Sequence, residues 1–210
     1  MARRPNIWSS LVHYPVLDRE GNVVTTSVTN MDVHDLARSS RTYGLERFVI
    51  TTPIDIHRRM VLKVAALWQE ESYARRNPSR KLALQLVRAA PRIEEAAVMV
   101  EKETGRRPSI VGTSARRLEG ALTFEAVRDE ILADADAPWL ILFGTGWGLA
   151  PQALSLCTHV LEPVEGSDGY NHLSVRSAAA VILDRLLGRP QGAPSGAPAA
   201  RVPRIDRKHT

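Results

Sequence analysis

Trp139-Leu-Ile-Leu-Phe143 runs without a break into Gly144-Thr-Gly-Trp-Gly148, and this stretch decides the fold. An apolar run that is bounded by turn residues predicts a strand buried on both faces. The three glycines that follow permit backbone torsions that other side chains forbid, and they let a ligand approach main-chain amides closely. The stretch therefore predicts a buried strand whose carboxyl end carries a loop suited to ligand binding.

On either side of this strand, short apolar runs alternate with segments of helical periodicity. This alternation is typical of a mostly parallel sheet flanked by helices, so the predicted fold class is α/β. The predicted strands cover residues 7–14, 47–51, 82–89, 109–112, 139–143 and 158–161. Long helices are predicted for residues 53–73, 91–103 and 172–187, and a short one contains Pro151.

Capping residues mark the ends of the other helices. Asn30 and Asp32 are candidate N-caps of a helix that runs through Tyr43 and ends at Gly44. Thr123 is expected to cap a helix whose N3 residue is alanine, so the full capping box is absent there. For the last helix, Asn171 is the candidate N-cap.

The positive charge of the chain is concentrated at its C-terminal end. The 210 residues carry a formal net charge of +5. Residues 189–210 hold five basic residues against Asp206, so they account for +4 of it and residues 1–188 for +1. This Pro/Gly/Ala-rich segment lacks apolar residues for packing and is predicted to be a disordered basic tail. Residues 1–188 are therefore predicted to form a single domain.

Several classes of protein are disfavoured by the sequence. The longest apolar stretch, residues 137–143, is far shorter than the roughly 18 to 20 residues of a membrane-spanning helix. Two arginines near the N-terminus are not followed by the apolar run of a secretory signal, so we expect a cytoplasmic protein. A single cysteine, Cys157, excludes a disulfide within the chain and a multi-cysteine metal site, and no metal is expected.

The glycine loop admits three interpretations. A dinucleotide site would place its ribose-binding acid near Glu162 or Glu165, but the spacing is Gly-x-Gly-x-Gly, and Pro151 interrupts the helix that should face the pyrophosphate. A tight turn without a ligand is the second interpretation. A site for a different nucleotide-like ligand is the third, and we favour it.

The runs Phe143-Gly-Thr-Gly-Trp-Gly-Leu149, Leu161-Glu-Pro163 and Gly169-Tyr-Asn-His-Leu-Ser-Val-Arg-Ser177 resemble the cofactor half of the SPOUT methyltransferases. These enzymes modify RNA and bind S-adenosylmethionine (SAM). Residues 13–15, 25–30 and 34–44 fit the same pattern, so the resemblance covers nearly all of residues 7–188. Within this superfamily the chain is most similar to the bacterial group related to the tRNA (guanine-N1)-methyltransferase fold.

The resemblance implies a C-terminal trefoil knot, a homodimer, and a bent SAM molecule in a cleft between three loops. The residues that match the cofactor-binding loops are Thr113, Ser114, Phe143, Gly144, Thr145, Gly146, Gly148, Leu149, Leu161, Pro163, Tyr170, Asn171, His172, Leu173 and Ser174. Arg41, Arg176, His13 and Tyr14 are the corresponding candidates for contact with the RNA substrate.

The first helix holds the candidate catalytic residues Arg38, Asp35 and Asp32. In the ribose-methylating relatives an essential arginine lies six residues before a glycine, as Arg38 lies before Gly44. Those relatives have asparagine where Asp32 stands. A carboxylate suits proton removal from a base nitrogen, so methylation of a base and of a ribose both remain open.

The sequence thus predicts a SAM-dependent methyltransferase that acts on a nucleotide of tRNA or rRNA. A non-catalytic RNA-binding or assembly factor with the same fold is the main alternative. A nicotinamide-dependent oxidoreductase is the third.

Overall fold

A computed structural model of the chain describes residues 4–188. Its core is a six-stranded sheet in the order β5-β4-β1-β7-β6-β8, in which every neighbouring pair is parallel. The strands are β1 (Asn6–Val12), β4 (Arg47–Thr51), β5 (Val87–Ala90), β6 (Ser109–Gly112), β7 (Pro138–Gly144) and β8 (His159–Val160). The predicted α/β class is confirmed, and the basic tail at residues 189–210 lies outside the described residues.

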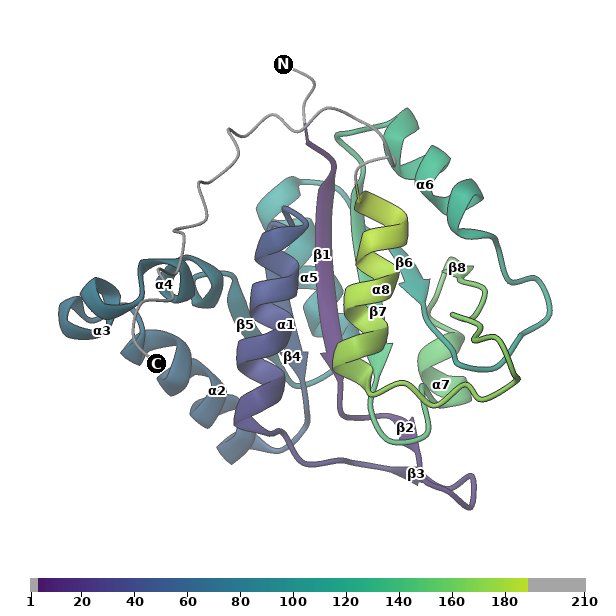
Figure 1. Cartoon of the computed structure of the whole chain (residues 1–210), viewed down its shortest axis with the longest axis horizontal. Coiled ribbons are helices and arrows are strands. Elements are labelled where there is room, and N and C mark those ends of the chain that lie inside the picture. Colours follow the sequence, from purple (N-terminus) through teal and green to yellow (C-terminus); the bar gives the residue numbers. More distant parts are fainter. Residues whose placement is uncertain (1–3, 189–210) are drawn as a thin grey trace, which may run out of the picture.

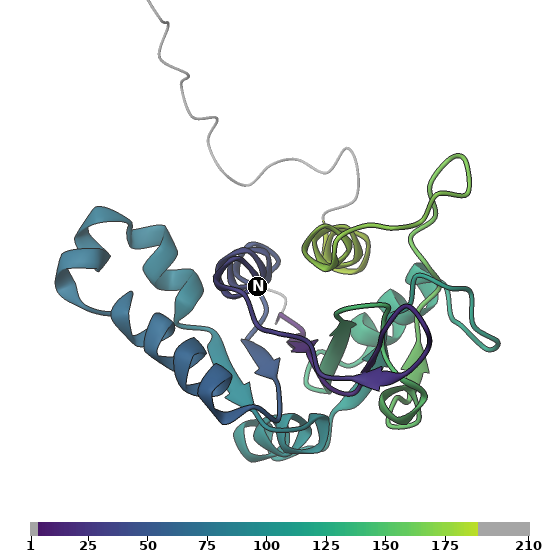
Figure 2. The same ribbon diagram turned by 90° about the horizontal axis from the view of Figure 1, so that it is seen from below.

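Helices cover both faces of the sheet (Figures 1 and 2). One face packs against α1 (Asn30–Thr42), α6 (Phe124–Ala133) and α8 (Val175–Leu187), and the other against α5 (Ile93–Thr104) and α7 (Pro151–Leu154). Successive residues of β7 alternate between these two cores: Ile141 and Phe143 face α1 and α8, and Leu140 and Leu142 face α5. The run at 139–143 is buried on both faces, as predicted.

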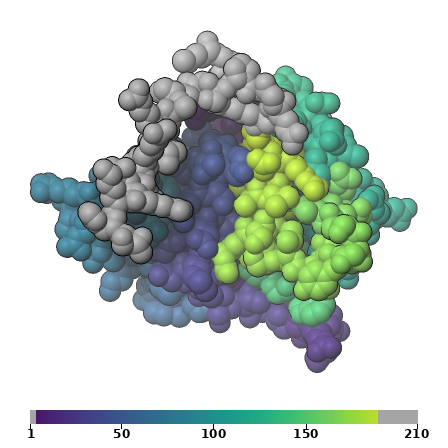
Figure 3. All heavy atoms as spheres, viewed as in Figure 1, coloured from purple at the N-terminus to yellow at the C-terminus, as the bar shows by residue number. Residues whose placement is uncertain are grey.

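Helices α1 and α8 run side by side across one face (Figure 1), and atoms of these two parts of the sequence adjoin on the surface there (Figure 3). Arg176 in the first turn of α8 binds Asp32 in the first turn of α1. Towards the other ends, the Tyr43 hydroxyl donates a hydrogen bond to Asp184 over 3.1 Å. The two helices therefore place their N-termini together at the carboxyl ends of β1 and β7.

The segment between β4 and β5 differs from the prediction. The expected helix 53–73 is divided into α2 (Asp55–Leu67) and α3 (Glu71–Arg76), because the chain turns where the Trp68 ring packs against His34, Tyr73 and Arg80. The expected strand 82–89 is divided between α4 (Pro78–Leu84) and β5. Asn77 caps α4 by accepting a hydrogen bond from the Arg80 amide, so the apolar run begins in a helix and ends in the sheet.

Two helix starts also differ from the prediction. The N-cap of α1 is Thr29, not Asn30 or Asp32; its hydroxyl accepts from the Asp32 amide, and the Asp32 carboxylate accepts from the Thr29 amide. The N-cap of α8 is Ser174, whose side chain accepts from the Ser177 amide, so residues 171–173 precede the helix. The Thr123 cap of α6 is confirmed.

A small antiparallel hairpin, β2 (Val16–Leu17) and β3 (Val23–Val24), follows β1 and lies against the glycine loop. Leu17 donates to the Gly148 carbonyl and accepts from the Trp147 amide, each over 2.9 Å. None of the helices in residues 4–188 is long and apolar enough to cross a lipid bilayer.

Candidate functional site

A cleft of about 980 Å³ opens at the carboxyl ends of β1, β6 and β7. Three segments line it: residues 113–116 after β6, residues 143–149 in and after β7, and residues 169 and 171–176 before and within α8. The hairpin and the residues that follow it close a fourth side with Leu17, Asp18, Arg19, Gly21, Thr26, Ser27 and Thr29. The three loops that the sequence predicted to form one site therefore converge on it.

Most of the predicted site residues line this cleft. They are His13, Asp32, Thr113, Ser114, Phe143, Gly144, Thr145, Gly146, Gly148, Leu149, Asn171, His172, Leu173, Ser174 and Arg176. Seven others do not line it: Tyr14, Asp35, Arg38, Arg41, Leu161, Pro163 and Tyr170. The cleft is also lined by Asp18, Arg19, Thr26, Ser27, Thr29 and Arg116, which were not among the predicted site residues.

The glycines of the loop are required first by the loop's own packing. A Cβ atom on Gly144 would lie 2.5 Å from the Leu149 amide nitrogen, and one on Gly146 would lie 2.7 Å from the Leu17 carbonyl oxygen. Gly146 and Gly148 also have positive φ angles of 60° and 100°, which L side chains rarely adopt. At 144 and 146 the missing side chain therefore allows close approach of the protein's own backbone, and the close approach of a ligand to this loop stays a prediction.

A chain of hydroxyl groups determines the tautomer of His13. Thr145 Oγ1 donates to the Val12 carbonyl over 3.0 Å, so it accepts from Thr26 Oγ1, which lies 2.5 Å away. The single proton of Thr26 is thereby used, and its oxygen must accept from His13 Nδ1 at 2.9 Å. The neutral ring therefore carries its proton on Nδ1 and a lone pair on Nε2.

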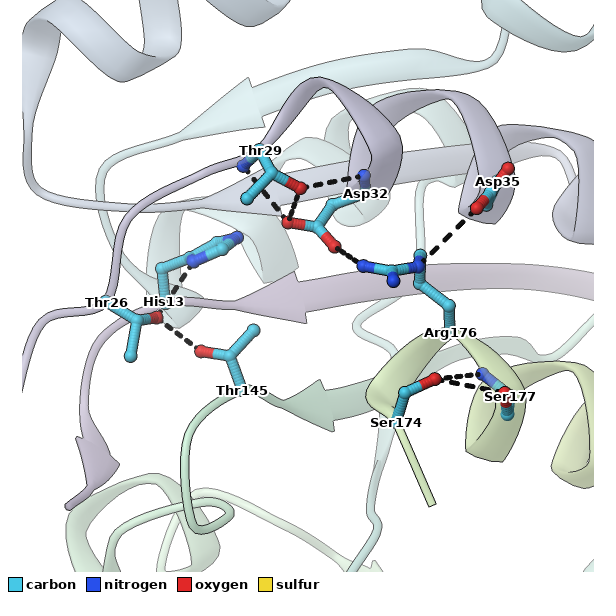
Figure 4. A network of polar contacts seen from close by, with 9 residues as sticks. All are labelled: His13, Thr26, Thr29, Asp32, Asp35, Thr145, Ser174, Arg176 and Ser177. Atoms are coloured by element: carbon cyan, nitrogen blue, oxygen red, sulfur yellow. Dashed lines mark hydrogen bonds and ion pairs between the residues drawn. The ribbon is translucent and has the colours of Figure 1, made fainter.

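His13 is fully buried, and its Nε2 has no hydrogen-bond partner within residues 4–188. Burial lowers the pKa of His13 to about 4; the Asp32 carboxylate opposes that shift, and His57 adds to it. The ring points from the end of β1 towards the capping box of Thr29 and Asp32 (Figure 4). His13 is thus a neutral hydrogen-bond acceptor in the wall of the cleft, and not a group that exchanges protons near pH 7.

Arg176 joins the two helices that flank the cleft (Figure 4). Its Nη1 lies 2.9 Å from Asp32 Oδ1, and its Nε lies 3.5 Å from Asp35 Oδ2. The Asp32 side chain is only 7% exposed, so this carboxylate is both a helix cap and half of a largely buried ion pair. The acidic partners explain how a cation is tolerated in the first turn of α8, where the helix dipole disfavours it.

The other candidates on α1 have different surroundings. Arg38 is exposed, and no partner for its guanidinium is found in the described part of the chain. His34, in contrast, packs edge-on against Trp68 with ring centroids 5.7 Å apart, and burial lowers its pKa. His34 therefore contributes to the packing of α1 against Trp68.

The segment before α8 is fastened to the loop after β6. Asn171 Nδ2 donates to the Ala115 carbonyl over 2.7 Å, and Arg117 pairs with Glu165 over 2.9 Å. Leu161 and Pro163 precede this segment and are buried, and the Leu161 amide donates to the Gly112 carbonyl. These two residues lie outside the lining of the cleft.

A family model described as SAM-dependent RNA methyltransferase matches residues 6–188. The chain belongs to this family. The matched residues contain the whole sheet, the cleft and α8, so the matched region and the described structure coincide almost completely.

Relatives and solved structures agree with the membership. A protein of Aquifex aeolicus, named only "uncharacterized protein", is 42% identical over 184 residues, which cover 88% of this chain and 89% of the relative. A protein of Oleidesulfovibrio alaskensis named tRNA (guanine-N(1)-)-methyltransferase is 46% identical over 183 residues. The match covers 87% of this chain but 42% of that protein, so the chain spans less than half of it.

Among solved structures, TrmJ from Z. mobilis superposes with a TM-score of 0.56 at 18% identity, covering 92% of this chain and 72% of TrmJ. The SpoU methyltransferase AviRb from Streptomyces viridochromogenes, in complex with the cofactor AdoMet, gives a TM-score of 0.53 at 18% identity. It covers 89% of this chain and 58% of AviRb. These likenesses support the SPOUT fold that the sequence predicted.

The cleft of this family member fits SAM by the chemistry of its lining. Phe143, Leu149 and Ile182 offer apolar walls, and the loop of residues 144–149 offers main-chain polar groups. Arg116 and Asp18 bring opposite charges to the same cleft, as a ligand with both a carboxylate and cationic groups requires. No group of three or more His, Cys, Asp or Glu side chains in residues 4–188 is arranged to hold a metal ion.

Proposed function

We propose that this chain uses its cleft to transfer the methyl group of SAM to a nucleotide of RNA, with tRNA as the favoured class of substrate. The observation that carries the proposal is the convergence of the three loops on one cleft at the carboxyl edge of the sheet. The family supports an RNA acceptor. The names of two relatives, which this chain matches over 42% of their length, favour tRNA over rRNA.

When bound, SAM supplies an electrophilic methyl group on a sulfonium centre. The chain's own residues must hold the ligand in a fixed orientation and exclude water around it. The hairpin contributes by fixing the glycine loop from outside through Leu17. Arg176 contributes by tying α1 to α8 at the cleft wall.

We further propose that the active unit is a homodimer. Arg38 is the candidate catalytic arginine, yet it is exposed and does not line the cleft of its own chain. A second copy packed against this face would bring Arg38 towards a cleft and remove it from solvent. Size-exclusion chromatography with light scattering tests this: a mass near 46 kDa, twice the 23.2 kDa of one chain, is expected, and a monomer at micromolar concentration contradicts it. The trefoil knot and the cytoplasmic location stay predictions.

Isothermal titration with SAM, and with NAD in parallel, tests the cofactor. Saturable SAM binding without NAD binding is expected. The second step is incubation with SAM carrying a tritiated methyl group and either unfractionated tRNA or rRNA. Radioactivity in tRNA is expected; labelled rRNA alone would change the substrate class, and SAM binding without transfer to either would disfavour the proposal.

A non-catalytic RNA-binding factor is the second candidate, and one observation favours it. Asp32 and Asp35, two of the three candidate catalytic residues, are both engaged by Arg176, and the third, Arg38, does not line the cleft. Such a factor would bind tRNA with or without SAM and would show no transfer. The tritium experiment therefore separates the two candidates.

A further inference from the structure

Three rings stand in contact at the mouth of the cleft. Trp147 lies edge-on to His172 with centroids 6.0 Å apart, and His172 lies edge-on to Tyr170 at 5.2 Å. We call these three side chains the ring ladder. Trp147 comes from the glycine loop and the other two from the segment before α8, so the ladder bridges two of the cleft-forming segments.

The rings of the ladder are largely exposed to solvent, which is unfavourable for large apolar side chains. Trp147 is 54% exposed and Tyr170 is 71% exposed, the two highest values among the described Trp, Tyr and Phe side chains. By contrast, Trp8 and Trp139 are at most 4% exposed. A contiguous exposed apolar surface next to a cleft marks a binding site more often than a scattered surface residue does.

The backbone beneath the ladder is held in place on both sides. The Trp147 amide donates to the Leu17 carbonyl, which turns the main chain of this residue towards the hairpin. Asn171, between the other two rings, is fastened to the Ala115 carbonyl at 2.7 Å. The rings therefore project from anchored segments, which reduces the entropy lost when a ligand stacks on them.

The ladder leads out of the cleft. Trp147 and His172 belong to the cleft lining, whereas Tyr170 lies outside it. Arg19 and Arg116 line the same cleft, are exposed, and have no ion-pair partner among residues 4–188. An aromatic strip with unpaired arginines nearby is the combination that binds an unpaired nucleotide, because the base stacks and the phosphate pairs with the cations.

We propose that the ring ladder is the subsite for an unpaired base of the RNA acceptor, held beside the methyl donor. This inference rests on the proposed function and specifies its substrate: the target nucleotide, or its neighbour, must be unstacked. A base within a continuous duplex would not reach the rings without being extruded. The other occupant to be tested is the methionine arm of SAM, which Trp147 could cover instead.

The test compares Trp147→Ala, Tyr170→Ala and the conservative Trp147→Phe with Leu132→Ala. Leu132 is a matched control because it is 61% exposed but lies on α6, outside the cleft lining. The probe is a fluorescein-labelled single-stranded oligoribonucleotide of mixed sequence, with unfractionated tRNA as competitor. Affinity is measured by fluorescence anisotropy, and SAM affinity is measured separately by calorimetry.

We expect Trp147→Ala to weaken RNA binding at least about fivefold, the lower end of the loss of one stacked base, with SAM affinity unchanged. Tyr170→Ala should weaken it less, Trp147→Phe should restore most of it, and Leu132→Ala should have no effect. In the wild type, RNA should quench tryptophan emission, and Trp147→Phe should remove most of that quenching.

Two results would overturn the inference. Loss of SAM affinity in Trp147→Ala with RNA affinity intact would assign the ladder to the cofactor. Unchanged affinity for both ligands in Trp147→Ala and Tyr170→Ala would leave it without a binding role. Neither result depends on turnover, so a wild-type chain that binds RNA but transfers no methyl group would defeat the proposed function and leave the ladder testable.

Discussion

The two ends of α1 have opposite surroundings. At its first turn, Asp32 is buried, caps the helix and pairs with Arg176, and Asp35 shares the same arginine. One to two turns later, Arg38 and Arg41 are exposed and have no ion-pair partner in the described part of the chain. The first end is completed by other residues of the described structure, whereas the second presents charge that no described residue neutralises. The first end of α1 thus serves folding, and the second is the end that we propose for recognition.

The largest effect should follow removal of the buried carboxylate. Asp32→Ala deletes the carboxylate that accepts from the Thr29 amide in the capping box and leaves Arg176 without its nearer partner, which should cost about 3 to 5 kcal/mol of unfolding free energy. Asp35→Ala is the control: it is 48% exposed and 3.5 Å from the arginine, so its loss should cost below about 1 kcal/mol. Urea denaturation measures both, and equal costs would contradict the distinction between them.

The second-largest effect should come from acid, which should lower the unfolding free energy through the buried His13. The folded-state pKa of His13, about 4, lies below its ordinary value of 6.5, so between these values only the unfolded chain takes up the proton. Stability should therefore be fully present above pH 6.5 and should fall by about 3 kcal/mol as the pH decreases to 4. His34 adds a loss in the same direction.

His13→Asn isolates this contribution, since an asparagine amide can still donate to Thr26. Urea midpoints measured between pH 4 and pH 7.5 should then depend less steeply on pH than in the wild type. If the variant and the wild type show the same slope, His13 is not the group responsible.

The exposed end of α1 should show the reverse pattern. Arg38→Ala should change the unfolding free energy by less than about 0.5 kcal/mol, because the side chain has no described partner to lose. Methyl transfer to tRNA should fall at least about tenfold, since one charged contact made only in the reacting complex is worth that much. Arg38→Lys retains the charge and should recover part of the rate. Full turnover in Arg38→Ala would remove this residue from the reaction.

Much of the fold was predictable because local signals and tertiary packing agree. The run at 139–143 is β7, the strand at 47–51 is β4, and Thr123 caps α6. The errors lie where packing decides between local options: Trp68 ends α2 through contacts with α1, α3 and α4, which no local pattern contains. The N-cap of α1 could have been predicted from the sequence, because Thr29-Asn-Met-Asp32 has the spacing of a capping box.

The site was predictable through its loops and less so through its individual residues. Residues 113–114, 143–149 and 171–176 meet at the cleft as expected. Arg19 in the hairpin and Thr26 just after it were missed because nothing in residues 16–29 shows that this segment folds back onto the glycine loop. The partners of Arg176 were missed for the same reason, since Asp32 lies 144 residues away in sequence.

The smallest effect should come from Arg41, one turn beyond Arg38 on the exposed end. Arg41→Gln should weaken tRNA binding a few-fold and reduce the slope of log affinity against log salt by about 1, the change for one phosphate contact. Lys102→Gln removes an exposed charge from α5, on the opposite face of the sheet, and should change neither quantity. Anisotropy titrations of labelled tRNA at several KCl concentrations measure both variants. Equal changes in the two would mean that tRNA responds to the total charge of the chain, and α1 would then lose its distinction as the recognition face.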